Sequence, residues 1–183
     1  MEENGKKGYG IHSLKMRILL IINVSVLLAT IANLAIVIPM VRNNMLEVNK
    51  NYIFDMAKSY GKTMQQIYDT MGEKMYEDGT VEGVLGGASI AGVETSYVYL
   101  VDKHGIMRYH PTAQGQPVNN DVIARLVEQM ASGIKPPAEI VRYSIDGDAR
   151  FTGYYISDRM NFIVVFTAAE EEILAPMNSM IMR

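Results

Sequence analysis

The sequence predicts an α+β fold in which a long N-terminal helix packs on a five-stranded antiparallel sheet. Three observations indicate this fold. An uncharged apolar run is followed by a long segment with helical periodicity and no proline. Five later segments are rich in β-branched and aromatic residues and are separated by turn residues. Two amphipathic helical stretches lie between and after these strands, and short turns rich in Asp and Gly connect the strands as antiparallel hairpins.

The apolar run comprises residues 18–41, with Lys15 and Arg17 before it and Arg42 after it. A helix of that length reaches roughly 36 Å, enough to cross a hydrocarbon core about 30 Å thick. A cleaved signal peptide is the alternative, but its apolar region is normally about 7–15 residues long and precedes a small-residue cleavage site. The longer run favours an uncleaved transmembrane helix, and therefore a protein of the cell membrane.

Charge on the two sides of this span predicts its orientation, because cationic flanks stay in the cytoplasm. Four basic residues precede the span and only two follow it closely, so residues 1–17 are expected to form a cytoplasmic tail. The remainder is then extracytoplasmic. Acidic residues outnumber basic ones after the span, which argues against a nucleic-acid partner. The basic residues concerned are Lys6, Lys7, Lys15 and Arg17 before the span, and Arg42 and Lys50 after it.

Catalytic and cofactor chemistry has no recognisable motif in the chain. There is no cysteine, so neither a disulfide nor a thiolate metal site is expected. The three histidines are dispersed and no carboxylate cluster accompanies them, which argues against a catalytic metal. No nucleophile stands beside a base. We therefore expect no enzyme, no cofactor and no metal.

Residues 42–75 form the long helical segment that follows the span. Their apolar side chains recur at steps of three, four and seven, which places them on one stripe of a helix. Such a stripe packs either on the sheet of its own domain or on the same helix of a second copy, so a homodimer is one expectation. The stripe consists of Met45, Tyr52, Met56, Tyr60, Met64, Ile67, Met71 and Met75.

The strands follow a glycine-rich loop over residues 72–92 that holds one short helical turn. The last strand is an almost unbroken apolar run, as expected for a central strand covered on both faces. The terminal helix is expected to be interrupted by Pro176, and the helices to lie on one face of the sheet. The predicted strands are residues 96–101, 106–110, 140–145, 150–157 and 161–168, and the predicted helices are residues 120–132 and 170–182.

Several of these segments together resemble the single-Cache extracytoplasmic sensor domains of bacterial methyl-accepting chemotaxis proteins, particularly those of clostridial type. The likeness covers roughly two thirds of the chain, in the family's order after the membrane helix. The Tyr-His-Pro-Thr segment between two strands is its most specific part. The similar segments are residues 96–102, the Asp102–Gly105 turn, and residues 107–112, 115–118, 141–143, 153–157, 162–165 and 173–178.

This resemblance implies a PAS-like sensor fold with a small-ligand pocket between the sheet and the connection from Pro111 to Pro137. Pockets in the family are lined by aromatic residues and one or two cationic or imidazole donors. Alternation along the strands places Arg108 and His110 on one face, but does not say which face meets the pocket. A guanidinium binds a carboxylate in bidentate fashion, so a small organic acid or an amino acid is the expected ligand. The candidate ligand-binding residues are Arg108, His110, Tyr97, Tyr99, Tyr143 and Tyr155.

The expected organisation is a tail at residues 1–17, a transmembrane helix at residues 18–41, a membrane-proximal helix at residues 42–75, and the rest of the sensor at residues 76–183. A cytoplasmic signalling module is expected beyond Arg183, since such sensors act through one. Histidine kinases and nucleotide cyclases carry the same kind of external domain, so the output class stays open. A membrane-anchored protein-interaction domain without a small ligand is the alternative function.

Overall fold

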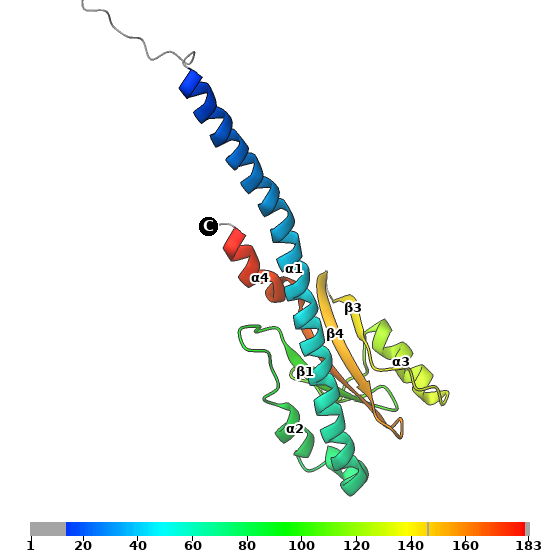
Figure 1. Cartoon of the computed structure of the whole chain (residues 1–183). Coiled ribbons are helices and arrows are strands. Elements are labelled where there is room, and N and C mark those ends of the chain that lie inside the picture. The colour runs from blue at the N-terminus through cyan, green and yellow to red at the C-terminus, as the bar shows by residue number, and fades with distance from the viewer. Residues whose placement is uncertain (1–13, 146, 182–183) are drawn as a thin grey trace, which may run out of the picture. The chain divides into compact units, whose positions relative to one another are not determined.

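The computed structural model describes residues 14–145 and 147–181. It divides the chain into two units, Met1–Asn43 and Asn44–Arg183. Helix α1 (Leu14–Met71) begins in the first unit, and all the other helices and strands belong to the second (Figure 1). We refer to the second unit as the globular unit.

The first unit contains the apolar part of α1, whose side chains are all exposed. Among the described residues, α1 is the one helix long and apolar enough to cross a membrane. Its polar side chains bond back to the preceding turn. The Asn23 amide donates to the Leu19 carbonyl at 2.9 Å, and the Thr30 hydroxyl donates to the Val26 carbonyl at 2.9 Å. These side-chain donors therefore find acceptors within the helix, which lowers the cost of placing them in an apolar environment.

The globular unit is built on one five-stranded sheet with the strand order β2-β1-β5-β4-β3, in which every neighbouring pair is antiparallel. Strand β5 occupies the centre and all its residues are buried, which confirms the central strand expected from its apolar run. The strands are β1 (Tyr97–Asp102), β2 (Met107–Tyr109), β3 (Ile140–Ile145), β4 (Asp148–Ile156) and β5 (Phe162–Ala169).

Four shorter helices complete the globular unit: the 3₁₀ helix η1 (Gly72–Tyr76), α2 (Thr80–Leu85), α3 (Asp121–Ala131) and α4 (Glu170–Ile181). The Asn120 side chain caps α3, because its oxygen accepts hydrogen bonds from the amides of Val122 and Ile123. The expected interruption at Pro176 is wrong. Helix α4 runs through this proline, which costs it one backbone hydrogen bond. Met182, the expected last residue of this helix, lies outside the described residues.

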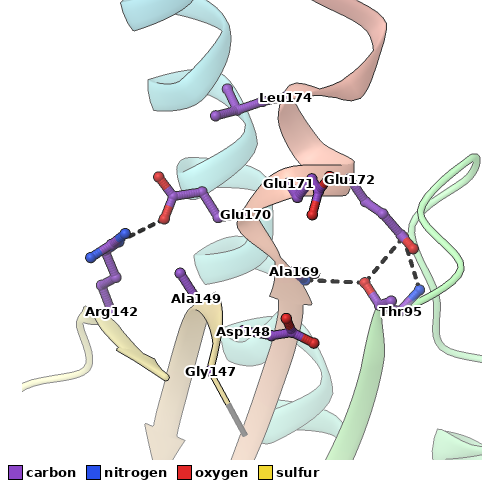
Figure 2. Close-up of a pocket in the computed structure, with 10 residues that line it drawn as sticks. All are labelled: Thr95, Arg142, Gly147, Asp148, Ala149, Ala169, Glu170, Glu171, Glu172 and Leu174. Carbon is purple, nitrogen blue, oxygen red and sulfur yellow. Dashed lines mark hydrogen bonds and ion pairs between the residues drawn. The ribbon is translucent and has the colours of Figure 1, made fainter. Parts of the chain in front are cut away.

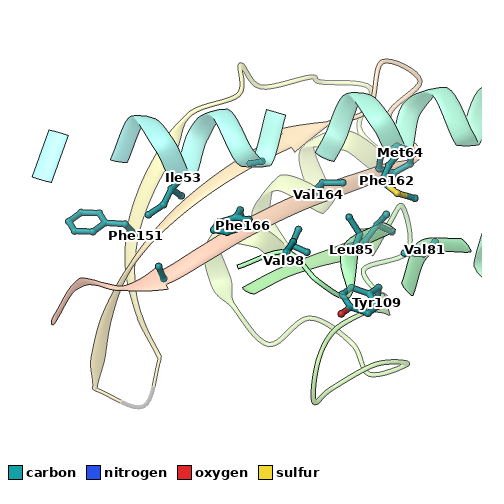
Figure 3. Packing of buried hydrophobic residues seen from close by; sticks show 14 of the residues in the cluster. Ile53, Met64, Val81, Leu85, Val98, Tyr109, Phe151, Phe162, Val164 and Phe166 are labelled. Atoms are coloured by element: carbon teal, nitrogen blue, oxygen red, sulfur yellow. The ribbon is translucent and has the colours of Figure 1, made fainter. Parts of the chain in front are cut away.

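Two separate hydrophobic cores flank the sheet. Helix α1 and α2 cover one face, where Ile53 and Met64 pack with Phe162 and Phe166 (Figure 3). Helix α3 covers the other face with side chains that include Ile123. The expectation that the helices share one face is wrong. Because β5 is apolar along almost its whole length, both of its faces must be buried, and each face takes a helix.

The contact between α1 and the sheet is made possible by small residues. Gly61 lies against the Tyr155 ring, and a Cβ atom on Gly153 would meet the Ile53 carbonyl oxygen at 2.9 Å. The predicted stripe of α1 is therefore only partly right: Met64 is fully buried, whereas Tyr52 is 44% exposed. The pattern counted large apolar side chains, but the closest approach of helix and sheet occurs where side chains are small.

Candidate functional site

Four aromatic side chains predicted as ligand contacts gather on the face of the sheet that α3 covers. The ring centroids of Tyr97 and Tyr99 lie 6.0 Å apart, and the His110 ring lies 5.1 Å from Tyr97 and 5.3 Å from Tyr99. The hydroxyl oxygens of Tyr99 and Tyr143 are 3.5 Å apart. We call Tyr97, Tyr99, His110 and Tyr143 the tyrosine–histidine cluster.

Strand register explains why these side chains meet. Tyr97 is opposite Thr167 and Tyr99 is opposite Val165, so period two directs both tyrosines to the α3 face. On the edge strand β3, Tyr143 is opposite Arg150 of β4, and both side chains belong to the same α3 face of the sheet. Burial raises the pKa of both β1 tyrosines, which therefore stay neutral and can donate hydrogen bonds.

His110 has a defined tautomer. Its Nδ1 atom accepts hydrogen bonds from the backbone amides of Thr112 at 3.1 Å and Ala113 at 3.0 Å. A ring nitrogen that accepts carries no proton, so the neutral ring keeps its proton on Nε2. Burial lowers the pKa of this imidazole, in agreement with a neutral ring. His110 can thus offer one N–H donor to a ligand.

Arg150 is a site residue that the sequence reasoning missed. It is only 8% exposed, its Nε donates to the Thr167 hydroxyl at 3.1 Å, and one terminal nitrogen donates to the Thr95 carbonyl at 2.5 Å. Its guanidinium carbon lies 5.1 Å from the Tyr97 ring centroid. No carboxylate among the described residues pairs with it. The sequence feature that could have identified Arg150 is a basic residue in a strand whose other residues are mostly of the kind buried inside a sheet.

A pocket of about 430 Å³ adjoins the cluster, within the size range of small-ligand sites. Arg125 lies in its wall and makes no ion pair or hydrogen bond with a residue that the structure describes. A second pocket of about 430 Å³ also contains Val122 and Arg125, so the two adjoin between α3 and β3. The first is lined by Asn119, Asn120, Asp121, Val122, Arg125, Tyr143, Ser144 and Ile145.

Arg108 lies apart from the cluster because β2 carries a bulge. Leu100 pairs with Tyr109 and Val101 pairs with Met107, so the register shifts around Arg108 and strict alternation fails. Met107 reaches the α3 face while Tyr109 reaches the α1 face. Arg108 instead donates to the buried Asp102 carboxylate at 2.6 Å. The expectation that Arg108 and His110 share a face does not hold.

Tyr155 also lies apart from the other candidates. It is opposite Val164 in the sheet and therefore faces α1, where its ring contacts Gly61. Burial raises the pKa of its hydroxyl, and the Asp158 carboxylate, which accepts a hydrogen bond from it, adds to this effect. The structure thus brings together four of the six predicted ligand contacts.

A larger pocket, of about 520 Å³, lies where α4 begins (Figure 2). The polar side chains on its two sides are mostly engaged with one another. Arg142 pairs with Glu170 at 2.6 Å, and the Glu172 carboxylate accepts from the amide and the hydroxyl of Thr95, each at 3.0 Å. The described residues contain no group of three histidine or acidic side chains placed to hold a metal ion. This pocket therefore offers fewer uncommitted groups than the region around Arg125.

Comparisons with known proteins support the fold. No protein-family model matches the sequence, and no curated protein matches it. Among solved structures, a Cache chemosensory domain described for carboxylic acid recognition matches with a TM-score of 0.51 and 13% identity, over 70% of this chain and 97% of that one. The globular unit therefore has the fold of the PAS-like Cache sensor domains.

Two further structures are more distant. The sensor domain of DcuS from E. coli matches with a TM-score of 0.42 and 14% identity, over 74% of this chain and 99% of that one. The ligand-binding domain of Mlp24, solved with asparagine, matches with a TM-score of 0.40 and 13% identity over 56% of this chain. The match spans only 39% of the Mlp24 chain.

Proposed function

We propose that this chain is the extracytoplasmic ligand-sensing part of a transmembrane chemoreceptor, and that it binds a small organic acid or amino acid on the α3 face of the sheet. The observation that carries the proposal is a pair of guanidinium groups on this side of the sheet. Neither Arg125 nor Arg150 pairs with a carboxylate of a described residue. Arg125 is exposed at the pocket wall, whereas Arg150 is buried. A buried cation without an acidic partner is costly, and a ligand carboxylate beside Arg150 would relieve that cost.

The surrounding groups suit such a ligand. Tyr143 lines the pocket beside Arg125 and its hydroxyl reaches Tyr99, so it links the pocket to the tyrosine–histidine cluster. Neutral tyrosines and the Nε2–H of His110 supply donors for carboxylate oxygens, and the rings exclude water. Arg108 and Tyr155 are not part of the proposed site, because one is bound to Asp102 and the other faces α1.

Signalling follows from a ligand that binds one state of the domain more tightly than another. We propose that binding shifts α1 or α4 by about 1–2 Å relative to the membrane, as in other helix-shift switches. The free energy available for this shift cannot exceed the difference in ligand affinity between the two states. Spin labels at Asn44 and Ala175 would change their distance when ligand binds, and an unchanged distance would contradict the proposed shift.

Dimerisation through α1 is a further part of the proposal. Val48 and Tyr52 are 66% and 44% exposed, although both are apolar and lie in the globular unit. A second copy of this helix would cover them. Sedimentation of the full chain in detergent is expected to show a dimer, and a monomer at high protein concentration would contradict it.

Ligand binding can be tested by thermal unfolding of the full chain in detergent, with a panel of small organic acids and amino acids. A ligand at 100 times its dissociation constant stabilises the folded state by about 2.7 kcal/mol. We expect at least one carboxylate to raise the unfolding temperature, and Arg125→Gln to abolish the rise. Arg159→Gln is the matched control, because Arg159 is exposed and pairs with Asp69 away from the proposed site.

A rise that survives Arg125→Gln and Arg150→Gln but disappears in Arg159→Gln would place the ligand elsewhere. No rise with any compound would favour the protein-interaction function instead. Both outcomes would overturn the assignment of an anion site to the α3 face.

A further inference from the structure

The segment that starts at His110 folds into a turn around the histidine ring. Nδ1 of His110 accepts from the amides two and three residues later, and the Thr112 hydroxyl lies 3.3 Å from the same nitrogen. Asparagine side chains make this type of bond when they nucleate turns. We call residues 110–113 the His110 turn. Ala113 of this turn packs against the core on the α3 face, so the turn closes one side of that core.

Protonation is incompatible with this arrangement. A proton on Nδ1 converts the acceptor into a donor, and it would then point at two backbone N–H groups. Both hydrogen bonds of the turn are lost together. No other ring atom can replace Nδ1, since Nε2 lies on the opposite side of the imidazole.

The groups around His110 also favour the neutral imidazole over the protonated one. The rings that face it from β1, Tyr97 and Tyr99, stay neutral because burial raises their pKa. Arg150 of β4 shares a neighbour with His110, because its guanidinium carbon lies 5.1 Å from the Tyr97 ring centroid. Tyr143 of β3 reaches this group through its hydroxyl, which lies 3.5 Å from that of Tyr99. No carboxylate among the described residues contacts the ring to stabilise an imidazolium.

We propose that His110 is a proton-operated latch that holds the His110 turn at neutral pH and releases it in acid. The latch gives the domain a second input besides the small ligand. That this input is the external pH rests on the proposed extracytoplasmic location, but the latch itself requires no ligand. A released imidazolium would add positive charge to the face of the sheet that holds Arg150, so acid and an anionic ligand would favour each other's binding.

The sign of the pH effect follows from the lowered pKa of His110. The unfolded chain has an ordinary histidine pKa of about 6.5. Between that value and the lower folded-state pKa, the unfolded chain binds more protons than the folded one. The contribution of His110 to the free energy of unfolding is therefore complete above about pH 6.5 and is lost as the pH falls below it.

Nuclear magnetic resonance of the uniformly nitrogen-labelled full chain in lipid nanodiscs tests the latch directly. We expect His110 to show a single Nε2–H tautomer at pH 7.5 and to titrate below pH 6.5. In the same samples, protection of the Thr112 and Ala113 amides from hydrogen exchange, corrected for intrinsic rates, should fall by up to about tenfold per pH unit below the pKa.

Three variants separate the latch from a general effect of acid. His110→Asn keeps an acceptor but cannot titrate, so protection should persist in acid; His110→Ala should be unprotected at every pH. His104→Gln is the matched control, because His104 is an exposed histidine of the β1–β2 turn, and this variant should behave like the wild type. Equal acid-induced loss in wild type and His110→Asn, or an Nδ1–H tautomer at neutral pH, would overturn the proposal. Neither readout depends on ligand binding, so failure of the proposed function would leave this test intact.

Discussion

Asp102 holds the β1–β2 turn through three hydrogen bonds. One carboxylate oxygen accepts from the amides of His104 and Ile106, and the other accepts from Arg108 at 2.6 Å. Asp102 is 3% exposed, so removal of its carboxylate leaves these donors without an acceptor in a buried environment. We expect Asp102→Ala to lower the free energy of unfolding by about 2 kcal/mol.

Chemical denaturation of the full chain in detergent measures this change. Asp102→Asn keeps an oxygen for the two amides and loses only the charged bond to Arg108, so it should cost less than Asp102→Ala. Equal stability of Asp102→Ala and wild type would show that the turn does not depend on this side chain.

At the scale of single residues, sequence reasoning found part of the candidate site. The two tyrosines of β1 and His110 could be predicted as site residues, because aromatic residues in strands and a Tyr-His-Pro segment can be recognised in the sequence. The prediction that Arg108 shares a face with His110 failed because a bulge interrupts the alternation of side chains in β2. A bulge without glycine has no sequence pattern that predicts it. Arg150 was overlooked since its burial depends on β5 lying next to β4, which is a property of the sheet order.

At the scale of elements, the contact between α1 and β4 depends on Gly153. A Cβ atom there would lie 2.9 Å from the Ile53 carbonyl oxygen and 2.9 Å from the Phe54 Cα. Backbone atoms cannot move aside as a side chain can, so Gly153→Ala should destabilise the globular unit by roughly 1–3 kcal/mol.

The same denaturation measurement checks this expectation. Gly83→Ala is the control, because Gly83 lies within α2 and a Cβ atom there meets nothing within 4 Å. A Gly153→Ala variant as stable as Gly83→Ala would mean that α1 does not approach β4 so closely.

The positions of the strands and the identity of the central strand were largely predictable from the sequence. Alternation and turn residues located all five strands, and the apolar run of β5 identified the central one. The placement of α3 opposite α1 was not predictable from an amphipathic pattern, because such a pattern shows that a helix has a buried side but not which face of a sheet receives it.

At the scale of the whole molecule, the proposed topology places the tail and the globular unit on opposite sides of the membrane. The natural absence of cysteine makes single-cysteine variants unambiguous. A membrane-impermeant maleimide added to intact cells should label Asp78→Cys, which is exposed before α2, and leave Lys6→Cys unlabelled. Labelling of Lys6→Cys in intact cells would show that the orientation is the reverse of the one proposed.

The central claim is that a small anion binds on the α3 face of the sheet, and tyrosine resonances report on it most directly. The full chain with labelled tyrosines would be titrated with the carboxylate that gives the largest rise in unfolding temperature. We expect the resonances of Tyr97, Tyr99 and Tyr143 to shift at saturation while that of Tyr155, on the α1 face, stays in place. Shifts confined to Tyr155, or none at all in the tyrosine–histidine cluster, would contradict the account.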